Sequence, residues 1–191
     1  RAEYMHEAGE KHGGAMFAVI GLEAGAIEEI CKGLENAFAV NYNSPLQTVV
    51  ACAKDVQDAL AQKVKQAGGK ALRLNVSGAF HSPFMNEAAQ KLGAFIEPLQ
   101  FSAGAMDVYS NVTAMPYTDK ELIRQQVNSP VRWQKTIENM AEAGVECFVE
   151  VGPGKTLSGL IKKIDSRAVA LNVENKASLE NALEVLLNVN G

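Results

Sequence analysis

One histidine, His81, stands where an apolar run gives way to residues that begin a helix. The run covers residues 71–76, and Ser82 and Pro83 directly follow the histidine. Serine caps helices, and proline suits their first turn. A histidine between two rigid elements can reach a cleft and act as a general base. The helix N-terminus should disfavour the imidazolium and keep the ring neutral. The alternative is an ordinary histidine in a surface loop.

The sequence around this histidine reads Gly78-Ala79-Phe80-His81-Ser82. This run resembles the histidine motif of malonyl-CoA:acyl carrier protein transacylases, which load malonyl groups for fatty-acid synthesis. Four further segments resemble the same family in the same order: residues 14–22 (GAMFAVIGL), 40–45 (VNYNSP), 129–133 (SPVRW) and 150–155 (EVGPGK). The resemblance covers essentially the whole chain, and five motifs in register make it specific.

The serine nucleophile of that family does not occur in this sequence. The family carries it on a Gly-His-Ser-x-Gly turn, preceded by a Gly-Gln-Gly-Ser segment, and no Gly-x-Ser-x-Gly pattern lies within residues 1–191. The sequence also starts at Arg1 without a capping residue, as if cut inside a helix. We therefore expect the C-terminal portion of a transacylase. Its N-terminal segment is then a required partner, and the chain alone is expected to be inactive.

The resemblance implies a two-step transfer through an acyl-serine. The serine attacks the malonyl thioester of coenzyme A, and the phosphopantetheine thiol of acyl carrier protein then takes the acyl group. His81 would take the serine proton and return it to the leaving thiolate. A backbone carbonyl orients the imidazole in this family, and it falls at Gln126, which can equally be an ordinary exposed residue. Malonyl-CoA is the substrate, and neither a permanently bound cofactor nor a metal is implied.

The resemblance also implies four substrate-binding residues. Arg1 matches the arginine that pairs with the free malonyl carboxylate, and a guanidinium binds a carboxylate with two parallel hydrogen bonds. Here the usual Arg-Gly-x-x-Met reads RAEYM, and a terminal residue can fray. Phe80 fits the malonyl class because its ring fills the space of an α-methyl group, or it is simply an aromatic plug beneath the loop. Asn41 and Asn43 either face the acyl group and pantetheine or belong to ordinary turn chemistry.

A glycine-rich segment, residues 152–156 (GPGKT), invites a different interpretation as a phosphate-binding loop. A Walker loop needs glycine five positions before Gly154, where the sequence has Val149. Pro153 also removes one N–H group that a phosphate would use. We therefore reject a nucleotide site and expect a tight turn near the cleft.

Composition and charge exclude several other classes. With a net charge of −4 and no stripe of Lys and Arg, the chain gives no electrostatic case for nucleic acid. No apolar run approaches the roughly 20 residues of a membrane span. The three scattered cysteines (Cys31, Cys52 and Cys147) favour a reducing compartment over a disulfide framework or a zinc site. We expect a cytoplasmic protein that uses neither membrane nor nucleic acid.

The order of elements predicts an α/β fold. Strand–helix–strand–strand–helix–strand over residues 15–76 is the order of a ferredoxin-like small subdomain. Residues 1–14 should be a helix ending near Gly9 and a flexible joint from the large subdomain. Over residues 77–191, helices alternate with short strands at 107–111, 146–151 and 168–173, which indicates part of a hydrolase-like parallel α/β domain. A parallel sheet needs partners on both sides, so the N-terminal segment should supply further strands.

Three functions remain open at this point. The first is the malonyl transfer from coenzyme A to acyl carrier protein that the resemblance implies. The second is an acyltransferase domain of a polyketide synthase, and the third is a non-catalytic module that binds a carrier protein. An acidic carrier would need a basic patch, for which Lys162, Lys163 and Arg167 are candidates unless they only complement a helix end.

Overall fold

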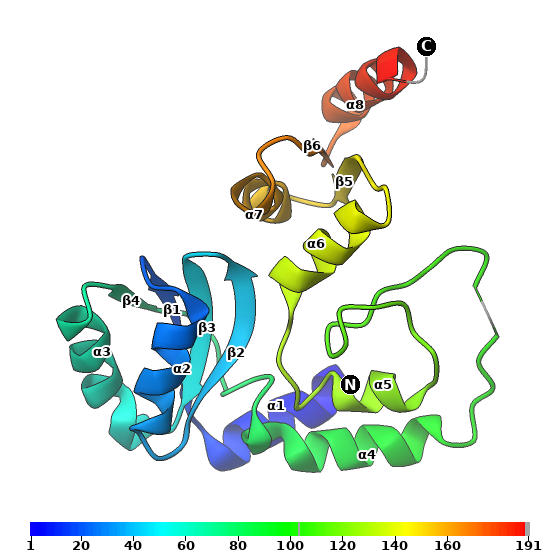
Figure 1. The fold of residues 1–191 in the computed structure, drawn as a ribbon. Coiled ribbons are helices and arrows are strands. Elements are labelled where there is room, and N and C mark those ends of the chain that lie inside the picture. Colours follow the sequence, from blue (N-terminus) through cyan, green and yellow to red (C-terminus); the bar gives the residue numbers. More distant parts are fainter. Residues whose placement is uncertain (103, 190–191) are drawn as a thin grey trace. The chain divides into compact units, whose positions relative to one another are not determined.

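The computed structural model describes residues 1–102 and 104–189. Its contacts divide the chain into two compact units, Arg1–Thr136 and Ile137–Gly191. Each unit combines helices with strands (Figure 1). The α/β class predicted from the sequence is therefore confirmed.

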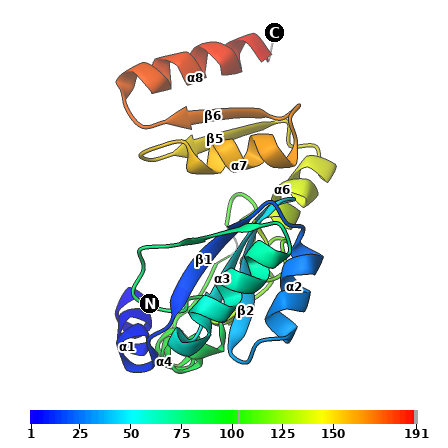
Figure 2. The ribbon, with the colours of Figure 1, turned by 90° about the vertical axis from the view of Figure 1, so that its left-hand side faces the viewer.

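A four-stranded antiparallel sheet forms the centre of the first unit. Helices α2 (Ala24–Lys32) and α3 (Gln57–Gln66) cover one face of this sheet (Figure 2). The strands lie in the order β2-β3-β1-β4, with the bounds β1 (Ala15–Ile20), β2 (Ala37–Ser44), β3 (Gln47–Cys52) and β4 (Lys70–Arg73). A 3₁₀ turn, η1 (Lys54–Val56), precedes α3. The predicted order of elements is present, although β4 ends before the predicted boundary at residue 76.

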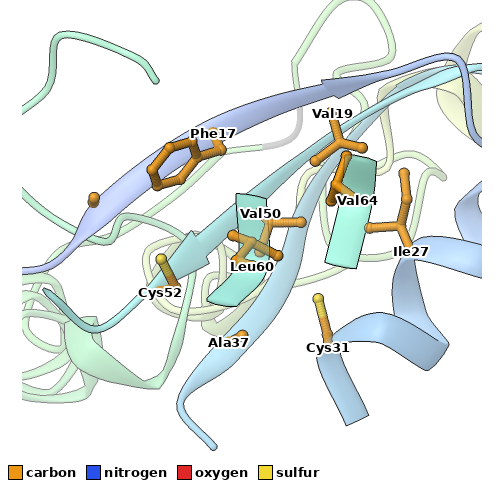
Figure 3. Packing of buried hydrophobic residues seen from close by; sticks show 10 residues of the cluster. Phe17, Val19, Ile27, Cys31, Ala37, Val50, Cys52, Leu60 and Val64 are labelled. Atoms are coloured by element: carbon orange, nitrogen blue, oxygen red, sulfur yellow. The ribbon is translucent and has the colours of Figure 1, made fainter. Parts of the chain in front are cut away.

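The two faces of the sheet bury different residues because side chains alternate along a strand. On the helical face, Phe17 and Val19 of β1 pack with Ile27 of α2 and with Leu60 and Val64 of α3 (Figure 3). The four-residue spacing of Leu60 and Val64 places both on the same side of α3. This cluster fixes the two helices on the sheet.

The opposite face of the sheet holds the loop that contains His81. Met16 and Ala18 of β1 belong to the same buried cluster as Ala79, and Phe80 packs against that cluster. Ala79 is fully buried. The residues directly before His81 are therefore anchored on the sheet.

Helix α1 (Ala2–His12) packs against α4 (Asn86–Ile96), and Lys11 forms an ion pair with Glu87 at 2.6 Å. The predicted end of this helix near Gly9 is wrong, because the helix continues through Gly9 to His12. Gly9 is buried, and a Cβ there would lie 3.3 Å from the carbonyl oxygen of Ser77. Gly9 thus allows the chain before His81 to approach the helix. Gly13, whose φ is 66°, caps the C-terminal end of the helix.

The stretch between α4 and the second unit is more irregular than the sequence predicted. The segment at 107–111 forms no strand in the described part of the chain, which contains there only an isolated bridge between Tyr109 and Pro116. Val108 is 59% exposed, so no neighbouring strand buries it. The helices that follow are α5 (Glu121–Gln125) and α6 (Trp133–Glu142), and a short 3₁₀ turn, η2 (Pro83–Met85), lies directly before α4.

The second unit contains a pair of parallel strands, β5 (Cys147–Val151) and β6 (Val169–Val173). Helix α7 (Thr156–Ile164) lies on one side of this pair and α8 (Lys176–Val189) on the other (Figure 2). The alternation of strands and helices predicted this parallel pairing. Among residues 1–102 and 104–189, the structure has no helix that is long and apolar enough to span a membrane.

Candidate active site

His81 has an uncommon backbone conformation, with a φ of 60°. This left-handed region is unusual for residues other than glycine, although histidine is among those enriched there. The next residue secures the turn: the Ser82 hydroxyl donates to the Ala79 carbonyl at 2.5 Å and accepts from the Phe84 N–H at 3.3 Å. The predicted capping role of Ser82 is confirmed, but it caps the short turn η2 ahead of α4.

The imidazole of His81 contacts the end of helix α5. Its Nδ1 lies 2.9 Å from the carbonyl oxygen of Gln126, the residue that follows the last turn of α5. The last carbonyls of a helix have no partner within the helix, so this oxygen is available to accept. Because a carbonyl can only accept, Nδ1 carries the proton in the neutral ring, and the lone pair is on Nε2. The ring is thereby set up as a proton acceptor through Nε2.

Burial lowers the pKa of His81 below its ordinary value. The hydrogen bond to the Gln126 carbonyl opposes this shift, as does a weaker one to the backbone of Ser129, and the positive charge of Arg1 adds to it. A lowered pKa favours the neutral ring, as the sequence predicted. The predicted cause was wrong, because the pKa is lowered mainly by burial and not by a helix N-terminus. Helix α4 begins only at Asn86, five positions after His81.

A groove of about 570 Å³ runs beside His81 in the first unit. It is bounded by the end of α2, the first half of β2, the turn at His81 and the residues next to Pro130. Phe38 and Pro83 contribute apolar surface, and Asn128 contributes a polar side chain. A groove with few polar groups beside a proton acceptor is typical of sites that bind small organic substrates.

A second polar pair lies in this groove and was not predicted. The Tyr42 hydroxyl donates to Oε1 of Glu28 at 2.7 Å, which joins β2 to α2. Burial and this hydrogen bond raise the pKa of Tyr42 above its ordinary range. Both residues lie between predicted site positions, but only the crossing of α2 over β2 brings their side chains together.

The two predicted asparagines lie on the same strand but differ in surroundings. Asn41 pairs with Val49 in the sheet and forms a bridge to Val131 in the SPVRW motif. Its Oδ1 is buried and has no partner among the described residues. Asn43 is partly exposed and falls at an irregularity of the pairing between β2 and β3. Among the described residues that line the groove beside His81, neither asparagine occurs.

The other two predicted substrate residues flank the histidine. Phe80 is partly buried and packs against the buried clusters on both sides of the loop. Arg1 is exposed and begins α1, where its carbonyl accepts from Met5 at 3.0 Å. Its positive charge helps to lower the pKa of His81, less than burial does. The structure thus brings His81, Gln126 and Phe80 together and places the charge of Arg1 near them.

In the second unit, carboxylates of the chain itself accept hydrogen bonds from backbone N–H groups in the GPGKT segment and directly after it. Glu150 accepts from the N–H groups of Leu157 and Ser158 at the start of α7, at 3.1 and 2.8 Å. Glu174 accepts from the N–H of Gly154 at 2.9 Å. These are the donors that a phosphate would use, which supports the rejection of a nucleotide site.

Two of the three basic side chains that could bind an acidic carrier protein already have partners within the second unit. Lys162 donates to the Ala168 carbonyl at 2.6 Å, and Arg167 pairs with Asp165 at 3.2 Å. No group of histidine, cysteine, aspartate and glutamate suitable for a metal occurs among residues 1–102 and 104–189.

Comparisons with known proteins give one consistent result. The chain matches the acyl transferase domain family over residues 3–180. It is 41% identical to a malonyl CoA-acyl carrier protein transacylase of Haemophilus influenzae, with 98% of this chain and 62% of that protein covered. The fold matches a malonyl CoA-acyl carrier protein transacylase from Clostridium perfringens with a TM-score of 0.94 and 35% identity, covering 100% of this chain and 62% of that one.

A third similar structure is a malonyl-transacylase in complex with a type II PKS acyl-carrier protein. Its TM-score is 0.90 and its identity 37%, with 96% of this chain and 62% of that one covered. The chain therefore spans about 62% of the length of the relatives it matches.

Proposed function

The chain belongs to the acyl transferase domain family, and we propose that its protein transfers a malonyl group from coenzyme A to the phosphopantetheine thiol of an acyl carrier protein. The observation that carries this proposal is the hydrogen bond from His81 Nδ1 to the Gln126 carbonyl. It places the proton of the neutral ring on Nδ1, and therefore the lone pair on Nε2, in a partly buried ring beside a groove. That arrangement suits a base that works without a carboxylate partner.

In the proposed reaction, a serine hydroxyl attacks the thioester carbonyl of malonyl-CoA while Nε2 of His81 takes its proton. The C–S bond breaks, the thiolate of coenzyme A leaves with the proton from the imidazolium, and malonyl-serine remains. The carrier thiol then gives its proton to Nε2 and attacks this ester. The serine oxygen recovers the proton as it leaves, so both halves of the reaction use the same nitrogen.

We propose that the serine comes from a segment of the protein outside residues 1–191. Two observations support this: the sequence has no Gly-x-Ser-x-Gly turn, and the relatives are longer than the chain. The chain alone is then expected to show no transfer.

The substrate-binding roles form part of the same proposal. Arg1 pairs with the free malonyl carboxylate, and its electrostatic effect on His81 supports a position near the reacting atoms. Phe80 limits the space beside the α-carbon. Asn41 offers a buried oxygen without a partner, which suits a ligand that donates a hydrogen bond. Asn43, on the same strand, is proposed to contact pantetheine.

We also propose a finer division of the fold. Residues 15–76 form a ferredoxin-like subdomain, which the antiparallel order β2-β3-β1-β4 supports. Residues 1–14 and 77–191 belong to a large hydrolase-like subdomain, and the parallel pairing of β5 with β6 supports this assignment.

The test uses the complete protein and malonyl-CoA labelled in the malonyl group. We expect covalent labelling that is discharged by an acyl carrier protein bearing phosphopantetheine. His81→Ala should slow the transfer by roughly 10²–10⁴-fold. Binding of the carrier without any labelling of the complete protein would instead identify a non-catalytic module.

A further inference from the structure

Strand β2 lies at one edge of the sheet of the first unit. In antiparallel pairing, alternate residues direct their N–H and C=O groups toward the neighbouring strand or away from it. Ala53 donates to the carbonyl of Asn36 across this pairing, and Phe38 is paired with Ala51. The groups of Phe38 therefore face β3, and those of Ala37 and Ala39 face outward.

Val131 of the SPVRW motif already forms hydrogen bonds with part of this outer edge. After an irregularity at Val40, the N–H of Val131 donates to the Val40 carbonyl at 2.7 Å. The N–H of Tyr42 then donates to the Val131 carbonyl at 2.9 Å. The pairing stops there, and the outward groups of Ala37 and Ala39 have no hydrogen bond in the described part of the chain.

Ala39 lines the groove beside His81 and lies on the sheet edge toward which its N–H and C=O point. Ala37 is only 6% exposed, whereas Ala39 is partly exposed, and both line the groove. Edge strands are usually protected by a charged residue or a proline, and the sequence Ala37-Phe38-Ala39 contains neither. The groove thus offers an N–H donor and a C=O acceptor at one residue, between apolar walls that include Phe38 and Pro83.

We propose that this edge binds the pantetheine arm, with the carbonyl oxygen of one amide of the arm accepting from the N–H of Ala39 and the N–H of its other amide donating to the C=O of Ala39. The inference rests on the proposed function, because coenzyme A and the carrier protein then share an arm that ends in a thiol. That arm is an extended chain with two secondary amides, and an extended amide chain can add to a sheet edge as a further strand. The same groove reaches His81, where the thioester reacts.

The first test is a proline substitution, Ala39→Pro, in the complete protein. It removes an outward N–H without removing a hydrogen bond between β2 and β3, and edge strands tolerate proline. We compare kcat/KM for malonyl-CoA with that for the malonyl thioester of ethanethiol, which has no amide. The ratio of the two kcat/KM values, which measures the preference for malonyl-CoA, should fall about three- to tenfold, because one hydrogen bond is lost. Holo carrier protein as the acceptor should show a similar loss.

The opposite edge of the same sheet supplies a matched control. Ala71 on β4 is paired with Val19, and the bond from Leu74 to Met16 shows that the N–H of Ala71 also faces outward. Ala71→Pro should therefore keep the preference for malonyl-CoA. If both proline variants lose it equally, or if Ala39→Pro slows both thioesters alike, the pairing at Ala39 is overturned.

A second measurement does not depend on a folded proline variant or on turnover. Pantetheine is titrated into the ¹⁵N-labelled complete protein, and the Ala39 amide is followed by NMR. We expect a saturable shift of this amide and slower hydrogen exchange. No change at Ala39 would overturn the proposal. A shift that depends on the protein concentration and not on pantetheine would also overturn it, because the edge would then bind a second copy of the protein. If the wild type shows no turnover but Ala39 responds, the proposed reaction fails and the arm site stands.

Discussion

His81 owes its chemistry to a backbone carbonyl that contacts its ring and to a neighbouring hydroxyl that holds its turn. The Gln126 carbonyl fixes the tautomer, and Ser82 secures the turn that aims the ring. The contact with Gln126 does not use its side chain. The identity of that residue is therefore less important than the place where α5 ends.

Replacing Gln126 tests this distinction. Gln126→Ala keeps the carbonyl, so kcat/KM of the complete protein should stay within about threefold of wild type. His81→Ala, which removes the base, should lose roughly 10²–10⁴-fold. A loss with Gln126→Ala as large as that with His81→Ala would show that the amide side chain acts directly.

The lowered pKa of the His81 imidazole gives a second prediction for this residue. Its folded pKa is lowered, chiefly by burial, so the acid limb of kcat/KM should have its midpoint below the usual value of about 6.5. The unfolded chain takes up this proton at a higher pH than the folded chain does. The free energy of unfolding should therefore decrease as the pH falls from about 6.5 through the folded pKa.

Arg1→Gln removes a charge that lowers this pKa. The His81 pKa, measured by NMR of the imidazole, should then rise toward its ordinary value. An unchanged titration in this variant would mean that Arg1 does not act on the ring.

The sequence indicated some of these residues because each carries a local signal. His81 and Ser82 lie in one motif, and the resemblance to the transacylases placed the orienting carbonyl at Gln126. The bond between Tyr42 and Glu28 has no such signal, because it depends on how α2 crosses β2. The burial that lowers the His81 pKa was also missed, since exposure is set by distant packing.

At the scale of elements, the close approach of α1 to the His81 loop is the feature that positions the site. A Cβ on Gly78 would lie 3.0 Å from Cα of Gly9 and 3.4 Å from the ring of Phe80. Both neighbours are constrained, one by the helix and one by packing on the sheet. Two glycines distant in sequence therefore set the position of the loop.

Gly78→Ala should push the loop away from α1. We expect the complete protein to lose about 1–3 kcal/mol of unfolding free energy in urea, together with transfer activity. Gly25→Ala is the matched control, because a Cβ on Gly25 in α2 meets nothing within 4 Å and alanine favours helix. Equal stability of the two variants would contradict the proposed constraint.

The elements themselves were predictable where side-chain periodicity was strong. The spacing of Leu60 and Val64 indicated α3, and apolar runs indicated the strands of the sheet. The segment at 107–111 shows the limit of this method. It has the composition of a short strand, but Val108 remains exposed because the described chain places no strand beside it.

At the scale of the whole molecule, the two units differ in how well their strands are shielded from solvent by pairing and burial. In the first, β1 and β3 are central strands with fully buried residues such as Val19 and Val50. In the second, β5 and β6 pair only with each other among the described strands, and Val151 is 80% exposed. A parallel pair exposed in this way has few contacts that oppose local opening.

Hydrogen exchange on this chain should reveal the difference. Amides of β5 and β6 should exchange about tenfold or more faster than those of β1 and β3, which corresponds to roughly 1.4 kcal/mol less opening free energy. Mass spectrometry of peptides from each strand measures this directly. Equal protection in both units would show that they open as one cooperative body.

The left-handed backbone at His81 has a practical consequence for trapping a complex. Asparagine adopts this region more readily than most residues, so His81→Asn should preserve the path of the loop where alanine would strain it. The variant would lack the proton acceptor yet keep the surrounding shape. Soaked crystals of the complete protein with this substitution should hold uncleaved malonyl-CoA, and electron density would then trace its route past the sheet.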